Sequence, residues 1–351
     1  WVEPVPQSAP APSTQPPSTQ PPQQPASMGG TCDRGLTING VGNDAYVLGH
    51  GASTAGDWLI LQQSAGLGIT STCQEDWDPH GFKIFRLLGK TLSFTVDLRH
   101  VGCACQLALF LVRGPGRDEL GEPSLGTCPW TPYYCDAHAM CGELCPEVDL
   151  MQASNQMFSA TPHKCDPPTE TGHYTSCDWW RCGQHTKDMG SAIYGLGMGY
   201  MIDTARPFQV STSFHGDAGG SQPVFTGMTT WLVQGSSRVL LDYSGCSGDA
   251  FQALADPMAA GMVLRVAYRG GDTSELATCS EDRCEGLGAG QAMISNITVS
   301  WTQEDRTSSG FFSGSVQSLV VGHLCVAGRY ADELGCLWPG PLSAVGGTAA
   351  A

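Results

Sequence analysis

Basic residues are scarce in this chain. Seventeen Lys and Arg stand against 33 Asp and Glu, so the formal net charge is −16 at pH 7. Nucleic acids and anionic membrane surfaces attract clustered basic side chains, and we therefore expect neither as a partner. The excess of acid is compatible with a neutral polysaccharide as partner, although simple solubility is the commoner cause of such a charge.

Long apolar runs are also missing. No stretch approaches the ~20 apolar residues that a membrane-spanning helix needs. Strong helix formers are sparse, whereas Gly (45 residues) and Pro (23 residues) are plentiful. This composition is typical of an all-β chain with many turns.

Several segments have the pattern of strands. Leu92, Phe94, Val96 and Leu98 alternate with more polar residues, and residues 106–112 form a continuous apolar run, as in a strand covered on both faces. Further strands are predicted at residues 83–88, 208–214, 261–266 and 294–301. Many short antiparallel strands predict a concanavalin-like β-sandwich, a jelly roll of two curved antiparallel sheets.

Sixteen cysteines, an even number, are spread from Cys32 to Cys336. Such a count is typical of a secreted protein with a disulfide framework, whose connectivity the sequence leaves open. A zinc site is the alternative for one group: Cys165, His173, Cys177, Cys182 and His185. Because an oxidising compartment favours disulfides, we expect disulfide bonds in this group, no metal, no cofactor and an extracellular location.

The chain divides into three parts by composition. Residues 1–30 are rich in Pro, Ser, Thr and Gln and are predicted to be a solvated linker. Residues 31–305 are predicted to form one folded domain, and we expect a monomer. Residues 306–351 are a tail rich in Gly, Ser and Ala, to which no function is assigned. The chain begins at Trp1, so a trimmed or partial sequence is expected, with something such as a carbohydrate-binding module upstream.

One short segment carries paired carboxyl groups. In an extended strand Glu147 and Asp149 project from the same face, because side chains alternate with a period of two. Two carboxyl groups one strand step apart suit acid/base or nucleophilic chemistry on a neutral substrate.

Several segments resemble glycoside hydrolase family 7, the retaining cellulases, in the same order along the chain. Residues 147–152 resemble the signature Glu-x-Asp-x-x-Glu, and residues 161–165 resemble Thr-Pro-His-Pro-Cys. Residues 133–138 resemble Gly-Tyr-Cys-Asp-x-Gln, with His138 in place of Gln. Residues 83–112 resemble a strand pair of the family. The ordered matches are more specific than any one motif.

The resemblance implies a role for each matching residue. Glu147 is the expected nucleophile, Asp149 the carboxyl group that supports it, and Gln152 occupies the acid/base position. One of the two neighbouring carboxyl groups should keep a proton. The predicted substrate-binding residues are Tyr134, Asp136, His138 and His163. The implied partner is a cellulose-like β-glucan.

Two departures from the family pattern affect the predicted activity. A carboxamide at position 152 cannot exchange a proton, and a general acid/base is worth roughly 10²–10⁴-fold in rate. Side chains at the same face of one strand are an even number of residues apart, so Gln152 reaches the site of Glu147 only if a bulge adds one residue. Where the resemblance predicts sugar-stacking Trp residues after the strand at Met262, residues 269–272 read Arg-Gly-Gly-Asp. This shortened loop favours an open, endo-type cleft over a tunnel.

Two hypotheses follow from the sequence. The first is a secreted endo-β-1,4-glucanase that retains configuration and has reduced activity because of Gln152. The second is a non-catalytic glucan-binding or cell-wall-associated protein on the same scaffold. A variant of the first has a neighbouring group, His138, His163 or Glu143, supplying the missing proton.

Overall fold

The computed structural model describes residues 34–302, apart from residues 43, 130, 179–181, 271–278 and 280–282. The predicted linker at residues 1–30 and the predicted tail at 306–351 lie outside the described residues, so the predicted domain limits stay predictions. Among the residues described, no helix has the length and apolar character to cross a lipid bilayer.

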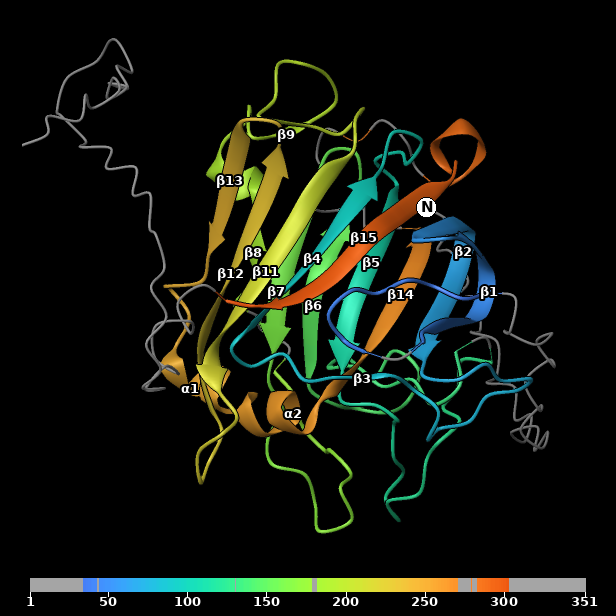
Figure 1. Cartoon of the computed structure of the whole chain (residues 1–351), viewed down its shortest axis with the longest axis vertical. Helices are drawn as coiled ribbons and strands as arrows, with labels where there is room; N and C mark the ends of the chain where they lie inside the picture. Colours follow the sequence, from blue (N-terminus) through green and yellow to red (C-terminus); the bar gives the residue numbers. More distant parts are fainter. Residues whose placement is uncertain are drawn as a thin grey trace, which may run out of the picture. The chain divides into compact units, whose positions relative to one another are not determined.

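The described part of the chain is mostly β-structure (Figure 1). Its strands are β1 (Tyr46–Ala55), β2 (Trp58–Thr70), β3 (Ile84–Phe85), β4 (Lys90–Asp97), β5 (Cys105–Val112), β6 (Glu147–Ala153), β7 (Phe158–His163), β8 (Gln184–His185), β9 (Tyr194–Gly195), β10 (Ile202–Asp203), β11 (Phe208–Asp217), β12 (Val224–Gln234), β13 (Ser237–Asp242), β14 (Met262–Gly270) and β15 (Ala292–Trp301). Two short α-helices, α1 (Gly248–Gln252) and α2 (Ala255–Ala260), and the 3₁₀ turns η1 (Thr186–Met189) and η3 (Gly286–Gly288) complete it.

One hydrogen-bonded path joins most of the strands, in the order β13-β12-β11-β4-β15-β2-β14-β5-β6-β7-β8. Strand β2 lies in both halves of this path. Its residues 59–61 pair with β15, whereas its residues 65–68 pair with β14. The long strand therefore passes from one sheet of the sandwich into the other, and β1 follows it as an antiparallel partner.

The two halves pack against each other through one large apolar core. In Figure 1, β11, β4 and β15 are drawn in front of β5, β6 and β7. The rings of Phe158 on β7 and Phe208 on β11 meet edge to face at 6.5 Å. Tyr243 follows β13 directly, and its hydroxyl donates to the Ala160 carbonyl of β7 at 3.3 Å. The predicted jelly-roll sandwich is thereby confirmed.

The alternation predicted for residues 91–98 is correct, because Leu92, Phe94, Val96 and Leu98 are all buried in this core. The run at residues 106–112 is β5, buried along its whole length. The predicted strand at residues 83–88 is reduced to β3, because only Ile84 and Phe85 pair with β14.

Six disulfide bonds join described cysteines. They are Cys103–Cys279, Cys105–Cys284, Cys128–Cys141, Cys135–Cys145, Cys165–Cys177 and Cys182–Cys246. Cys73 is disulfide-bonded as well. The zinc alternative is excluded, because Cys165, Cys177 and Cys182 are all oxidised.

Candidate active site

A bulge in β6 brings the three residues of the signature to one face. Against β5, Met151 pairs with Leu109 but Asp149 pairs with Phe110, so β6 holds one extra residue. Leu150 and Met151 both point into the core as a result. Gln152 therefore returns to the face that carries Glu147 and Asp149, as the odd spacing requires.

This face of β6 lines a cavity of about 470 Å³. All seven residues singled out in the sequence line it: Tyr134, Asp136, His138, Glu147, Asp149, Gln152 and His163. The other lining residues were not predicted as catalytic or substrate-binding residues: Gln106, Phe110, Met140, Met157, Ser159, Thr161, His185, Arg269 and Gly270. Four of them, Gln106, Phe110, Ser159 and Thr161, lie on β5 and β7, where alternation alone would have placed them beside the signature residues.

A cross-linked loop brings Asp136 and His138 to Glu147. The buried Asp136 carboxylate accepts hydrogen bonds from the backbone N–H of His138 at 2.9 Å and of Met140 at 3.0 Å. The turn that these bonds fix directs the Ala137 N–H to Glu147 Oε2, at 3.2 Å. The bond Cys135–Cys145 closes the loop around this turn.

We expect the double substitution Cys135→Ser, Cys145→Ser to lower the free energy of unfolding by about 3 kcal/mol, because a short loop loses its cross-link. The binding of cello-oligosaccharides that the resemblance predicts should weaken as well, since the turn at Asp136 is no longer held. The pair Cys128–Cys141 is the matched control, with a sequence separation of 13 against 10. Removal of Cys128–Cys141 should lower the free energy of unfolding in urea by a similar amount. It should weaken the binding of cello-oligosaccharides less than removal of Cys135–Cys145 does. Equal losses of binding in both variants would contradict a specific role for Cys135–Cys145.

Behind the signature, His163 lies between two acids. Its Nε2 is 3.5 Å from Asp149 Oδ2 and its Nδ1 is 3.5 Å from Asp178 Oδ1, and the ring is 1% exposed. Burial favours the neutral ring, but the adjacent carboxylates of Asp149 and Asp178 and the charge of Glu147 outweigh it and raise the pKa of His163 to about 10. At neutral pH His163 is thus a buried cation that balances the surrounding carboxylates.

Glu147 is buried, with 3% of its surface exposed. Burial, followed by the charges of Asp149 and Asp136, raises the pKa of Glu147 well above its ordinary value, against the opposing influence of His163 and of the Ala137 N–H. This carboxyl group is the one expected to retain a proton.

The carboxamide of Gln152 is held at both ends. Its Nε2 donates to Asp149 Oδ2 at 2.5 Å, and its Oε1 accepts from Gln106 Nε2 at 3.0 Å. These two bonds fix which end of the amide carries the oxygen. The group is therefore ordered next to the carboxylate pair, with no exchangeable acidic proton.

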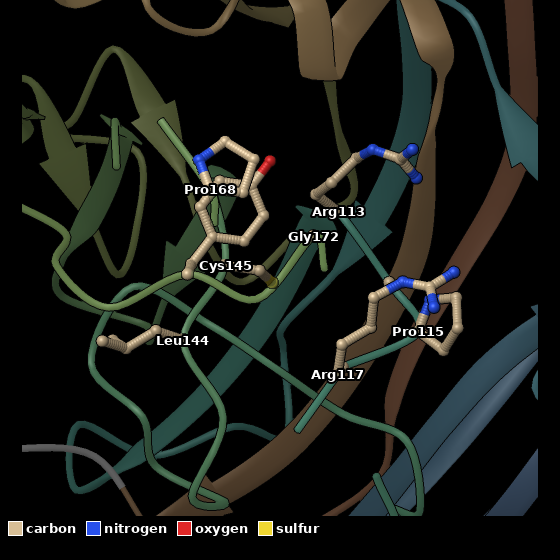
Figure 2. Close-up of a pocket in the computed structure, with 10 residues that line it drawn as sticks. Arg113, Pro115, Arg117, Leu144, Cys145, Pro168 and Gly172 are labelled. Atoms are coloured by element: carbon tan, nitrogen blue, oxygen red, sulfur yellow. The ribbon is translucent and has the colours of Figure 1, made fainter. Parts of the chain in front are cut away.

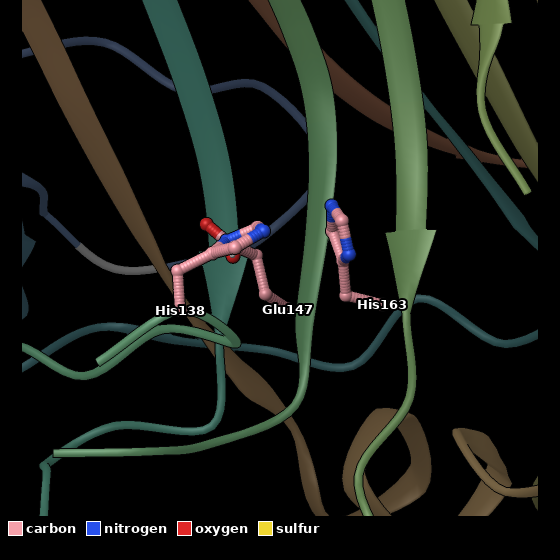
Figure 3. Close-up of side chains that lie close together, drawn as sticks. All are labelled: His138, Glu147 and His163. Carbon is pink, nitrogen blue, oxygen red and sulfur yellow. Dashed lines mark ion pairs between the residues drawn. The ribbon is translucent and has the colours of Figure 1, made fainter. Parts of the chain in front are cut away.

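His138, Glu147 and His163 have ligand-type atoms within 4.8 Å of one another (Figure 3). His138 comes from the cross-linked loop, Glu147 from β6 and His163 from the end of β7. A metal ion needs a lone pair on each imidazole. Both nitrogens of His163 face carboxylates and the ring is cationic at neutral pH, so the cluster is better described as an ion-pair network.

A second, smaller cavity of about 140 Å³ lies near the Arg113–Arg117 turn (Figure 2). Leu144, Pro168 and Tyr174 are among its other lining residues. No acidic side chain lines it in the described part of the chain, whereas Asp136, Glu147 and Asp149 line the larger cavity. Glu143, a possible substitute acid, pairs instead with His173 at 3.9 Å and is not among the described residues of the larger cavity.

Comparisons with known proteins agree with the resemblance. No protein-family model matches the chain. The endo-β-1,4-glucanase celB of Emericella nidulans is 28% identical over 251 residues, which cover 58% of this chain and 56% of that protein. Endoglucanase EG-1 of Hypocrea jecorina is 26% identical over 208 residues, which cover 54% of this chain and 43% of that protein. The chain thus spans about half the length of the curated relatives it matches.

Solved structures share the fold. An endoglucanase I complexed with cellobiose superposes with a TM-score of 0.53 at 19% identity, covering 71% of this chain and 77% of the other. A family 7 cellobiohydrolase from Daphnia pulex superposes with a TM-score of 0.52 at 17% identity, covering 71% and 79%. The fold of the described domain is the jelly roll of these enzymes.

Proposed function

We propose, from this distant relationship to the family 7 cellulases, that the protein is a secreted, monomeric glycosidase that acts on β-1,4-glucan and retains configuration. The observation that supports it most is the bulge of β6, which puts Glu147, Asp149 and Gln152 side by side in a cavity. Retaining glycosidases need two such groups flanking the glycosidic bond. The disulfide framework supports secretion.

In this proposal Glu147 attacks the anomeric carbon of the sugar while the bond to the leaving oxygen breaks, and a covalent glycosyl-enzyme forms. The Ala137 N–H, 3.2 Å from Glu147 Oε2, orients the nucleophile. The leaving oxygen must gain a proton, and in the second step the attacking water must lose one. Gln152 can do neither, so both steps are slow with ordinary substrates.

An alternative is a non-catalytic protein that binds glucan or associates with the cell wall. The ordered amide of Gln152 favours it, because Gln152 completes a hydrogen-bond network with Asp149 and Gln106.

Among the substitute acids, His138 has the best access to a substrate. Its side chain is 23% exposed and its Nδ1 lies 4.0 Å from Glu147 Oε2, whereas His163 is enclosed.

An activated aryl cellobioside tests the proposal, because its leaving group departs without a proton. We expect a burst of one aryl group per protein molecule, followed by a slow steady state. Azide should accelerate the steady state, because it attacks the intermediate without a base. The rate of the burst should increase with pH, because only the ionised Glu147 carboxylate attacks the sugar. The midpoint of this increase should lie above the ordinary Glu pKa of 4.5, because the pKa of Glu147 is raised.

The variant Glu147→Gln is the control and should show no burst. If wild type shows no burst while cello-oligosaccharides still bind, the protein is a binding protein. The sequence also predicts an open, endo-type groove, and we retain the open groove in the proposal. The loop expected to leave it open includes residues 271–278, which lie outside the described residues.

A further inference from the structure

The face of the sheet that carries the candidate site also carries a second buried cluster. This cluster is separate from the main core and consists of Leu48, Trp77, Phe82, Ala108, Phe110, Val112, Cys135, Cys145 and Val263. The pairing of the strands connects it to the site. Asp149 on β6 pairs with Phe110 on β5, which pairs with Arg265 on β14, which pairs with Gly68 on β2. A row that starts at the site therefore runs directly into the cluster.

Arg265 is the centre of this part of the face. It is 2% exposed, and its Cζ lies 4.2 Å from the centroid of the Phe82 ring, 5.7 Å from Trp77 and 5.8 Å from Tyr134. Cation–π contacts at these distances stabilise a buried guanidinium. We call Arg265 and these three aromatic residues the arginine plug.

The plug rests directly on the sheet. A Cβ added to Gly68 would lie 2.8 Å from Arg265 Nη1 and 3.1 Å from Phe82 Cε1. On the same strand, a Cβ added to Gly66 would lie 2.9 Å from Thr131 Cγ2. Contacts this short leave no layer of space between β2 and the side chains above it. A sugar ring cannot lie over Gly66 or Gly68 of β2 unless the side chains above them are displaced.

The loops that bear the plug are also tied together. The guanidinium Nη2 of Arg265 donates to the Pro132 carbonyl at 3.3 Å, and the rings of Trp77 and Phe82 lie 6.3 Å apart. Tyr134 belongs to the plug and also lines the cavity. The plug is therefore the wall at one end of the cavity, held from the strand below and the loops above.

The length left for a substrate follows from the strands that line the cavity. Glu147 and Gln152 are separated along β6 and must flank one glycosidic bond, so a bound glucan crosses the strands. The sheet residues of the cavity come from β5, β6, β7 and β8 and from the end of β14. From β14 to β8 there are four strand spacings, or ~19 Å, the length of about four pyranose rings. The volume of about 470 Å³ lies within the range for a single small ligand, roughly 300–1,000 Å³.

We infer that the arginine plug closes one end of the groove, so that the protein takes short β-1,4-linked oligosaccharides or the end of a glucan chain. This inference rests on the proposed function and narrows its substrate class. It differs from the endo-type action predicted from the sequence, which stays a prediction. A groove can be open along its length and still be closed at one end. A closed end prevents an internal stretch of a glucan chain from lying across the sheet.

The test is the affinity of the wild-type protein, by calorimetry, for cello-oligosaccharides of two to six units. We expect the affinity to increase up to three or four units and then to change by less than about twofold up to cellohexaose. An increase of about tenfold or more between cellotetraose and cellohexaose would overturn the closed end. Failure of all lengths to bind would instead refute the proposed function, so the two failures are distinct.

A variant tests the plug itself. Trp77→Ala should raise the affinity ratio of cellohexaose to cellotriose by about fivefold or more, because the wall at that end is opened. Trp231→Ala is the control for the loss of a Trp side chain, since Trp231 is exposed on β12 in the other half of the sandwich. An unchanged ratio in a folded Trp77→Ala protein would overturn the assignment of the wall to the plug. If that variant does not fold, the wild-type series still decides.

Discussion

We expect Gln152→Glu to raise the rate of hydrolysis of ordinary β-1,4-glucan oligosaccharides by roughly 10²-fold or more, the usual worth of a positioned acid/base. The reason is geometric. The side chain at position 152 already lies in the cavity beside Asp149, and Glu differs from Gln only in the group that can carry a proton. Initial rates of reducing-sugar release from cellotetraose would measure the gain.

The neighbours of position 152 favour the protonated form of the new carboxyl group. Gln152 Nε2 donates to Asp149 Oδ2, and a Glu side chain at this position keeps that hydrogen bond only as a carboxylic acid. The nearby carboxylate raises its pKa, as for paired carboxyl groups in general. A group that is protonated before the first step and can return the proton later is what retaining hydrolysis requires.

Gln106→Glu is the matched control. Gln106 lines the same cavity and is hydrogen-bonded to Gln152, so it receives the same chemical change one strand away. It should give no comparable gain. A similar gain in both variants would point to added negative charge, not to a positioned acid.

Two other outcomes decide between the hypotheses. If Gln152→Glu gains nothing while oligosaccharides still bind, the scaffold lacks more than a proton donor and the binding protein is the better description. If wild type already hydrolyses glucan rapidly, a substitute acid exists, and His138 is the first to test because it is the most exposed of the nearby candidates.

The signature could be located from the sequence because the positions of its side chains depend only on neighbouring residues of one strand. Alternation along β6 put Glu147 and Asp149 on one face, and the odd spacing to Gln152 required the bulge that β6 contains. Alternation along β4 and the apolar run of β5 likewise located core strands. In each case the pattern of a few consecutive residues was sufficient.

The arginine plug could not be predicted in this way. Arg265 is one charged residue in an apolar strand, and nothing beside it in the sequence indicates what compensates its burial. The rings that do so, Trp77 and Phe82, come from a loop far earlier in the chain. Asp178 was missed for the same reason, since its link to His163 exists only after β7 and the loop beyond Cys165 have folded. Contacts between distant segments produce no repeating pattern of residues from which they could be predicted.

His163→Gln should be the most destabilising single change at the site. It removes a buried cation from between Asp149 and Asp178, which lie 3.5 Å from its two nitrogens. Removing one partner from a buried ion pair costs about 3–5 kcal/mol, because the remaining charge is left without compensation. We expect this loss at pH 6 in the free energy of unfolding, measured with urea.

The loss of unfolding free energy caused by His163→Gln should become smaller as the pH rises. The pKa of His163 is raised in the folded protein from 6.5 to about 10, so folding binds its proton more tightly than the unfolded chain does. The stability that this group contributes is complete below pH 6.5 and is lost as the pH rises through about 10. The gap in unfolding free energy between wild type and His163→Gln should therefore be largest at pH 6 and should narrow strongly by pH 10 to 11.

Comparing the two proteins at each pH removes the contribution of the other groups that titrate in alkali. His215→Gln is the matched control, because His215 is a half-buried histidine on β11 for which a neutral amide can replace the contact to the Thr229 hydroxyl at 3.2 Å. We expect His215→Gln to lower the free energy of unfolding at pH 6 by much less than His163→Gln does. A gap for His163→Gln that is the same at pH 6 and pH 10 would mean that His163 is not the cation that balances these carboxylates. In that case Glu147 and Asp149 must share their charge in another way, and the pH dependence expected of the burst would also have to be revised.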